Sequence, residues 1–199
     1  MVRQYESVRF ADVHKQIMHL IPKSPSHILD IGAGTGRDAA GFAAMGHLVT
    51  AVEPTAELRR RATVLHACPR VEWLDDCLPE LAALSGRDAA FDVVMLTAVW
   101  MHLDEQQRRC AMPRVAALIR PKGVMMLSLR HGPVPVGRRM FNVTPAETAR
   151  LARAEGLTCV QYVADEDSLL KRPGVTWDRL AFIKAANSGT GDPGAGGLG

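Results

Sequence analysis

The chain has 199 residues, 47% of them hydrophobic, and a formal net charge of +3, so its composition predicts one globular domain and gives no concentrated positive charge for nucleic acid. No apolar stretch reaches the roughly 18 residues of a membrane span, and the first residues lack the apolar core of a signal peptide. Four scattered cysteines without a Cys-x-x-Cys pair indicate reduced thiols and give no metal-binding framework, so we expect a cytoplasmic protein with no bound metal.

The first segment has apolar residues at helical spacing. Val8, Val13 and Ile17 predict an amphipathic helix over residues 7–20, which a proline at position 22 ends. Three strand–helix units follow, and this alternation is typical of a parallel α/β sheet. The predicted strands are 28–31, 48–52 and 71–74, and the predicted helices are approximately 37–46, 56–65 and 78–84.

The second half of the chain continues this alternation. After a strand at 91–97, Asp104 is the predicted N-cap of a helix that Pro113 should kink. Beyond it the sequence predicts a strand at 123–129, a Gly/Pro-rich loop at 131–143, a helix at 144–155, and strands at 157–164 and 176–183. We expect residues 1–186 to form a single domain and the Gly-rich residues 187–199 to be a disordered tail.

The stretch Ile28-Leu29-Asp30-Ile31-Gly32-Ala33-Gly34-Thr35-Gly36 carries the most information about function. An apolar run ends in an acid, a loop with three glycines follows, and helix-forming residues come next. Glycine lets the backbone turn sharply and lets a ligand approach the main chain, and the following helix N-terminus offers free N–H donors. This unit predicts a site for a nucleotide-like or anionic ligand.

Two further acidic positions narrow the ligand. Glu53 directly follows the second strand, and Asp75-Asp76 follows the third. A carboxylate at the end of the second strand is the usual acceptor for two ribose hydroxyls, and the carboxyl edge of an open α/β sheet is where ligands bind. The three strands therefore bring acids to one edge of the sheet.

These motifs, in this order and spacing, resemble those of class I S-adenosylmethionine-dependent methyltransferases. Asp30–Gly36 matches the family's D-x-G-x-G-x-G motif, Glu53 matches its ribose-binding acid, and residues 75–79 (Asp-Asp-Cys-Leu-Pro) are similar to its adenine-side motif. Residues 91–96 resemble its fourth strand, and residues 118–127 resemble its Pro-x-Gly turn and fifth strand.

This resemblance covers residues 25–130. It implies a Rossmann-like, doubly wound α/β sheet of seven mostly parallel strands, with the last strand antiparallel and helices on both faces. It also implies S-adenosylmethionine as cofactor and S-adenosylhomocysteine as product. The N-terminal helical segment, residues 1–22, is expected to fold over the site.

The resemblance further implies that Asp30 orders the glycine loop and approaches the methionine amine of the cofactor. Tyr5 or Arg9 is expected near the methionine carboxylate. Asp75 and Asp76 are not separable from sequence, because either can face the adenine while the other caps the short helix. The expected cofactor-binding residues are Tyr5, Arg9, Asp30, Gly32, Ala33, Gly34, Gly36, Glu53, Pro54, Asp75, Asp76, Cys77 and Thr97.

The acceptor side is less well defined by sequence. Methyl transfer from a sulfonium has a good leaving group, so positioning can supply most of the acceleration, and a base is needed only where the acceptor loses a proton. His102 and His131 follow the fourth and fifth strands and are the candidate catalytic residues, since histidine suits proton transfer near neutrality. Alternatively, His102 caps or packs against a helix, and His131 only lines a wall.

Three residues at the same edge are candidate substrate contacts. They are Trp100, which is alternatively part of the core, Met101 and Arg130. We expect the 131–143 loop and residues 5–10 to cover the pocket, with Arg130 and His131 pointing toward the cofactor sulfur. A structural connection with Arg130 paired to a surface acid is the alternative.

On these grounds we expect methylation of a small molecule or peptide by a monomer or homodimer, because little chain lies outside the core fold. One alternative is a nucleic-acid or protein methyltransferase with the same fold. Another is a non-catalytic regulator that binds the cofactor. An NAD-dependent oxidoreductase is disfavoured, because its fingerprint is G-x-G-x-x-G whereas this chain has Gly32-x-Gly34-x-Gly36.

Overall fold

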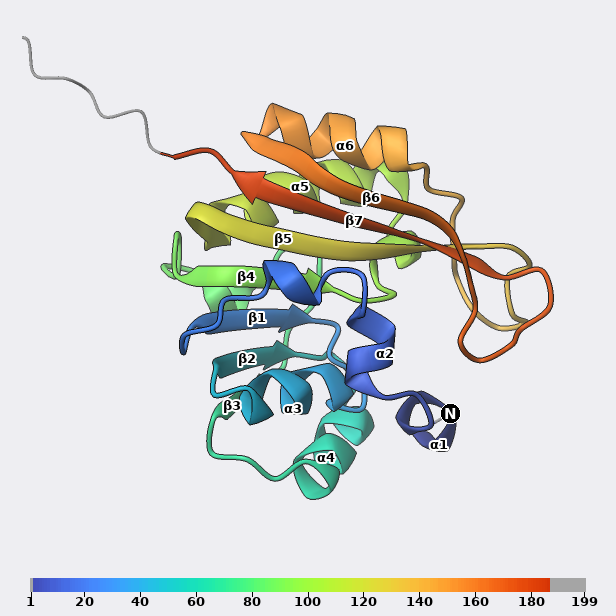
Figure 1. Cartoon of the computed structure of the whole chain (residues 1–199), viewed down its shortest axis with the longest axis horizontal. Helices are drawn as coiled ribbons and strands as arrows, with labels where there is room; N and C mark the ends of the chain where they lie inside the picture. Colours follow the sequence, from blue (N-terminus) through green and yellow to red (C-terminus); the bar gives the residue numbers. More distant parts are fainter. Residues whose placement is uncertain (1, 187–199) are drawn as a thin grey trace, which may run out of the picture.

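The computed structural model describes residues 2–186, so the predicted tail at 187–199 lies outside the described residues. The described chain forms a seven-stranded sheet in the order β3-β2-β1-β4-β5-β7-β6 (Figure 1). Its strands are β1 (His27–Ile31), β2 (Leu48–Val52), β3 (Val71–Leu74), β4 (Phe91–Leu96), β5 (Ile119–His131), β6 (Leu157–Asp167) and β7 (Thr176–Lys184).

The pairing confirms the predicted Rossmann-like sheet. Strands β1 to β5 pair in parallel, and β7 lies antiparallel between β5 and β6. The chain order reverses between β1 and β4, and open α/β sheets bind ligands beyond the carboxyl ends of the strands at such a point. The predicted strands are all present, although β5 begins at Ile119, before the expected start, and β6 extends to Asp167.

Helices lie on both faces of the sheet, as predicted (Figure 1). Helices α5 and α6 cover one face, and α2 and α3 cover the other. The helical segments are α1 (Val2–Glu6), α2 (Phe10–His14), η1 (Met18–Leu20), α3 (Arg37–Ala44), α4 (Ala56–Leu65), η2 (Ala82–Leu84), η3 (Trp100–His102), α5 (Glu105–Leu118) and α6 (Pro145–Ala154).

Strand alternation produces two hydrophobic cores. Leu29 of β1 packs in the core that α5 covers, whereas its neighbour Ile28 packs with Phe42 of α3 on the opposite face. Successive side chains of a strand point to opposite faces, so a strand covered on both faces must be apolar at nearly every position. This requirement explains the continuous apolar runs that identified the strands in the sequence.

The N-terminal segment differs from the predicted single helix over residues 7–20. It forms the separate short helices α1, α2 and η1. Phe10 begins α2 and lies directly on Gly41 of α3, where an added Cβ would be 2.3 Å from the Phe10 ring. The same ring meets Phe42 edge-on at 4.9 Å. Because Phe10 packs onto α3, the N-terminal segment bends there. This tertiary contact prevents the single helix that the hydrophobic periodicity predicts.

Two other predicted helices have different outcomes. The expected helix at 78–84 is reduced to η2, because the Asp76 carboxylate accepts a hydrogen bond from the backbone N–H of Ala83 (2.8 Å) and such a bond competes with helix formation. Asp104 caps α5 as predicted, since it accepts from the Gln107 N–H at 2.8 Å, and Pro113 lies inside this helix.

None of the helices within residues 2–186 has the length and apolar content to cross a membrane.

Candidate functional site

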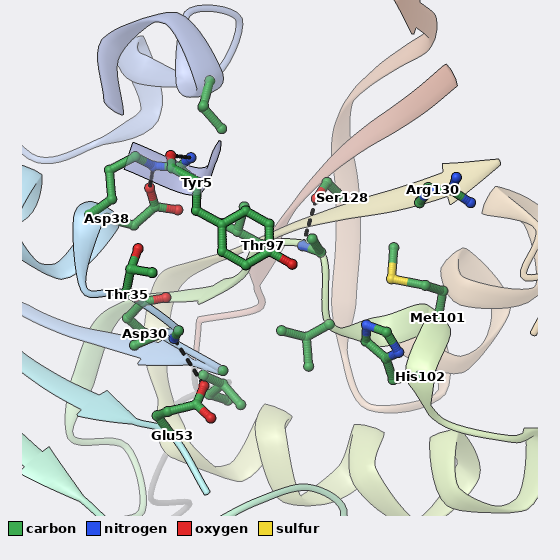
Figure 2. A pocket seen from close by; sticks show the side chains of 18 of the residues that line it. Tyr5, Asp30, Thr35, Asp38, Glu53, Thr97, Met101, His102, Ser128 and Arg130 are labelled. Carbon is green, nitrogen blue, oxygen red and sulfur yellow. Dashed lines mark hydrogen bonds and ion pairs between the residues drawn. The ribbon is translucent and has the colours of Figure 1, made fainter. Parts of the chain in front are cut away.

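A cavity of about 650 Å³ opens at the carboxyl edge of the sheet (Figure 2). Asp30 of β1, Glu53 after β2, Thr97 after β4 and Ser128 of β5 all line it. This volume lies in the usual range for a small-molecule or cofactor site. The cavity therefore occupies the position that the topology indicated.

The three motif glycines have different roles. At Gly32 (φ +72°), an added Cβ would lie 2.4 Å from Val99, so this glycine permits close packing of two loops. At Gly34 (φ +57°), an added Cβ would meet nothing closer than 3.9 Å, so this position leaves open space on the cavity side. Gly36 does not line the cavity, because an added Cβ there would lie 3.1 Å from Ala62 and Trp73.

Glu53 is buried and connects two loops through its carboxylate. Its Oε2 accepts from the Gly34 N–H (3.0 Å), and its Oε1 accepts from the Thr55 N–H (2.9 Å). Because an ionised carboxylate has about four lone-pair sites, each oxygen can accept a further hydrogen bond. These two hydrogen bonds fix the Glu53 side chain, and its remaining lone pairs can accept hydrogen bonds from the two hydroxyls of a diol.

Asp30 is a carboxylate that lacks a full set of partners. It is 1% exposed, and its Oδ2 has no hydrogen-bond partner among the described residues. Burial and the nearby Asp38 carboxylate raise the pKa of Asp30 well above its ordinary value. The Oγ1 of Thr97 is likewise buried in the cavity wall without a described partner. The site thus presents unsatisfied oxygen atoms to whatever occupies it.

Sequence reasoning missed a buried ion cluster under the glycine loop. The Asp38 carboxylate lies 2.9 Å from His14 Nε2 and accepts from Arg37 Nε at 2.7 Å. Although burial opposes its ionisation, these two neighbours hold the pKa of Asp38 below the usual range. His14 comes from α2, so this pair fixes the N-terminal segment to the start of α3. An acid in the first helical turn was the available signal.

The structure separates the two adjacent aspartates. Asp75 does not line the cavity, and its carboxylate accepts from Arg59 at 2.8 Å. Asp76 lines the cavity, and its carboxylate accepts from the N–H groups of Cys77 and Ala83, each at 2.8 Å. Only Asp76 is therefore positioned beside a ligand.

Three segments cover the cavity. Tyr5 of α1 lines it, and its hydroxyl accepts from Arg138 Nη2 (2.9 Å) in the loop after β5. Met140 of that loop also lines it, consistent with the expectation that the loop and the N-terminal segment cover the pocket. Residues 167–172, in the hairpin between β6 and β7, form a third part that sequence reasoning missed. Arg9 does not line the cavity, because its exposed side chain pairs with Asp12.

The segment after β4 contributes the candidate base. His102 lines the cavity, and its Nδ1 lies 2.8 Å from the Arg139 carbonyl oxygen. Met101 also lines the cavity. Trp100 does not, because its side chain is 1% exposed within the core. Trp100 is therefore a core residue, as the alternative interpretation had it, and not a substrate contact.

The expectation that His131 points toward the cofactor is wrong in this structure. His131 does not line the cavity, and its Nε2 pairs with Asp178 of β7 at 2.9 Å. Arg130 and Ser128 do line the cavity, and alternate strand residues face opposite sides, so His131 faces the other side of the sheet. A strand that continues to His131, where a loop had been predicted, fixes this orientation.

The other predicted site residues line the cavity as well. They are Ala33, Pro54 and Cys77 on the cofactor side and Arg130 on the acceptor side. Within residues 2–186, no group of three or more His, Cys, Asp or Glu side chains is arranged as a metal site.

Sequence comparisons identify relatives of the chain. The sequence model of the family described as "Methyltransferase domain" matches residues 28–123. An uncharacterized methyltransferase of Mycobacterium tuberculosis is 30% identical over 119 residues, which cover 57% of this chain and 58% of that protein. The match therefore spans less than two thirds of the length of this curated relative.

Solved structures share the fold over most of the chain. A Burkholderia thailandensis 1,6-didemethyltoxoflavin-N1-methyltransferase, with bound 1,6-didemethyltoxoflavin and S-adenosylhomocysteine, has a TM-score of 0.68 and 27% identity, covering 88% of this chain and 76% of that one. The cyclase SpnF has a TM-score of 0.69 and 14% identity, covering 89% of this chain and 80% of that one. Because one fold serves different chemistries, function has to be argued from the residues of the site.

Proposed function

Because the chain belongs to the class I S-adenosylmethionine-dependent methyltransferase family, we propose that it transfers the methyl group of S-adenosylmethionine to a small-molecule or peptide acceptor. The observation that carries this proposal is the buried Asp30 carboxylate beside the glycine loop, whose Oδ2 lacks a partner among the described residues. The methionine ammonium of the cofactor would supply that partner, and its positive charge would favour the ionised form of Asp30.

The other residues of this end fit the cofactor too. Glu53 would accept the two ribose hydroxyls with the lone pairs that Gly34 and Thr55 do not use. Asp76 and Cys77 would lie along the adenine. When bound, the cofactor supplies an electrophilic methyl group on a sulfonium. The residues of the chain would hold the cofactor and the acceptor in position for the transfer.

Positioning is the main catalytic contribution that we assign to the protein. The cover formed by α1, the loop after β5 and the β6–β7 hairpin would enclose the acceptor and exclude water. Met101, Leu103 and Met140 give this part of the cavity apolar walls. Holding two reactants in a reactive orientation can remove several kcal/mol from the barrier, on the order of 7–11 kcal/mol in the best cases.

We assign the role of general base to His102 where the acceptor must lose a proton. A carbonyl oxygen can only accept, so the 2.8 Å contact with the Arg139 carbonyl places a proton on Nδ1. In neutral imidazole, Nε2 then carries the lone pair, and no described residue donates to it. The backbone contact therefore selects the tautomer that can accept a proton.

Calorimetric titration of the full chain tests the cofactor assignment. We expect S-adenosylmethionine and S-adenosylhomocysteine to bind with micromolar dissociation constants, about −8 kcal/mol, and NAD not to bind. The Arg109→Gln variant, which alters an exposed ion pair on α5, should behave like the wild type. Binding of NAD without binding of S-adenosylmethionine would overturn the proposed function.

A further inference from the structure

We propose that the acceptor carries an anionic group, either a carboxylate or a phosphate monoester, and that Arg130, Arg138 and Arg172 bind it. This inference rests on the proposed function, because it names the substrate class of the same cavity. The three arginines come from the end of β5, the loop after it and the β6–β7 hairpin, and all line the cavity. They are brought together only by the fold.

Arg130 is the strongest evidence, because it is a buried cation without a counter-ion. The residue is 7% exposed, and no ion pair forms with it among the described residues. Its Nη1 and Nη2 donate to the carbonyl oxygens of Gly132 (3.3 Å) and Pro133 (2.7 Å), whereas its Nε is buried without a described partner. An uncompensated buried charge is costly, and an anion in the cavity would compensate it.

Arg138 and Arg172 add two further cations with neutral partners. Arg138 donates to the Tyr5 hydroxyl and Arg172 to the Gln4 side-chain oxygen, each at 2.9 Å. Burial and the like charges of these two arginines lower the pKa of Arg130, which indicates that the three share one region. Among the described residues, neither Arg138 nor Arg172 has a carboxylate partner.

Other arginines of the cavity lack this property, because each has a carboxylate partner. Arg37 pairs with Asp38, Arg139 with Asp104, and Arg179 with Glu166. Three of the six arginines that line the cavity are therefore paired with a carboxylate, whereas Arg130, Arg138 and Arg172 have no carboxylate partner among the described residues. Such selectivity is typical of a site whose counter-ion arrives with the ligand.

The local charge balance points the same way. At the end of the cavity formed by residues 130–140 and 167–179, the single acidic lining residue in the described chain is Asp167. Because Arg139 and Arg179 are already paired with Asp104 and Glu166, three guanidinium groups remain for this one carboxylate. One additional anionic group on the acceptor would bring this end close to neutrality.

Arg130 lies away from the cofactor end. Figure 2 shows Arg130 on the opposite side of the cavity from Asp30, Asp38 and Glu53. Most of the lining carboxylates therefore lie at the end assigned to the cationic cofactor, whereas Arg130 lies at the other. Because the cofactor also has a carboxylate, the test must distinguish a shared anion site from an acceptor site.

The test uses the full chain saturated with S-adenosylhomocysteine and three probes with one aromatic ring: benzoate, phenyl phosphate and the neutral benzamide. At constant ionic strength, we expect at least one anion to bind about tenfold or more tightly than benzamide, and its identity shows which anionic group the acceptor carries. Arg130→Gln should weaken that anion about tenfold, whereas Arg109→Gln, an exposed arginine on α5, should not.

Three results would each overturn the inference. They are equal binding of benzamide and both anions, equal effects of Arg130→Gln and Arg109→Gln, and an anion that displaces S-adenosylhomocysteine. If Arg130→Gln does not fold, Arg172→Gln is the test variant, because the Arg172 side chain is less buried and donates to the Gln4 side chain and not to a backbone carbonyl. Failure of the proposed function is distinguishable, because it appears as loss of S-adenosylhomocysteine binding in the wild type.

Discussion

The two ends of the cavity are built differently. At the cofactor end, Asp30 lies in β1, Glu53 directly follows the adjacent parallel strand β2, and the glycine loop donates to Glu53 through the Gly34 N–H. At the other end, the lining comes from α1, the loop after β5 and the β6–β7 hairpin. One end is fixed by the sheet, and the other depends on contacts between loops.

The two ends of the cavity also differ in the charge of their side chains. The sheet edge concentrates carboxylates that hold backbone N–H groups, as Glu53 does with Gly34. The loop end concentrates arginines that hold neutral oxygens, as Arg138 does with Tyr5. We infer that a family-wide cofactor is bound by rigid elements, while an acceptor particular to this chain is recognised by segments that can vary without disturbing the fold.

The largest expected effect belongs to His102, which lies in the segment after β4. His102→Ala should lower kcat about 100-fold or more with an acceptor that must lose a proton, since it removes the base. The dissociation constant of S-adenosylmethionine should stay within about twofold, because His102 makes no contact with the glycine loop. Steady-state kinetics and calorimetry measure the two quantities. Unchanged kcat would mean that positioning alone accounts for catalysis.

Asp30→Asn tests the assignment of Asp30 to the cofactor end of the cavity. A hydrogen bond to a charged group contributes about 1.5–3 kcal/mol, so we expect affinity for S-adenosylmethionine to fall roughly 10- to 150-fold. Because the pKa of Asp30 is raised, protonation of its carboxylate should also lower wild-type affinity as the pH falls, and the variant should lose this dependence. Calorimetry at several pH values checks both, and a pH-independent wild type would contradict the ammonium assignment.

Glu53→Gln tests the ribose contact with a side chain of the same size. Replacing one acceptor oxygen with a donor should weaken cofactor binding about 10- to 100-fold while the fold persists. Glu57→Gln on the exposed face of α4 is the matched control. An unchanged dissociation constant in Glu53→Gln would place the ribose elsewhere.

Asp30→Asn should also increase stability without ligand. The folded-state pKa of Asp30 is raised, so its contribution to stability is greatest below the ordinary aspartate pKa and is lost as the pH rises toward the folded pKa. The variant avoids this loss, and at pH 8 its melting temperature should exceed that of the wild type, by about 2–4 °C for each kcal/mol gained. The difference should disappear at low pH in thermal melts. A lower melting temperature at pH 8 would show that Asp30 stabilises the fold.

The smallest effect is expected at the cover. Tyr5→Phe removes the hydroxyl that accepts from Arg138, and one hydrogen bond contributes about 1 kcal/mol. The KM for the acceptor should therefore rise about fivefold, with little change in S-adenosylmethionine affinity. Initial-rate kinetics measure the first and calorimetry the second. A change confined to cofactor affinity would assign Tyr5 to the cofactor end.

The sheet could be predicted because both its faces are covered. Buried strands such as β2 and β4 must be apolar at most positions, and this makes them visible in the sequence. The glycine loop was equally visible, because the positive φ at Gly32 and Gly34 favours glycine. Local rules therefore identified the cofactor end.

The acceptor end could not be predicted in the same way. Whether Arg130 or His131 faces the cavity depends on where β5 ends, and the strand is longer than its pattern indicated. Arg138 and Arg172 are far apart in the sequence and meet only through tertiary packing. The break of the N-terminal helix likewise depends on Phe10 docking at Gly41, which no local pattern reports.

The most direct test of the central claim compares two variants against two ligands. S-adenosylhomocysteine is titrated into Asp30→Asn and Arg130→Gln, and the preferred anionic probe is then titrated with S-adenosylhomocysteine at saturation. We predict that Asp30→Asn weakens only S-adenosylhomocysteine and that Arg130→Gln weakens only the anion, each by about tenfold or more. If either variant weakens both ligands equally, the two ends are not separate binding sites and the account is wrong.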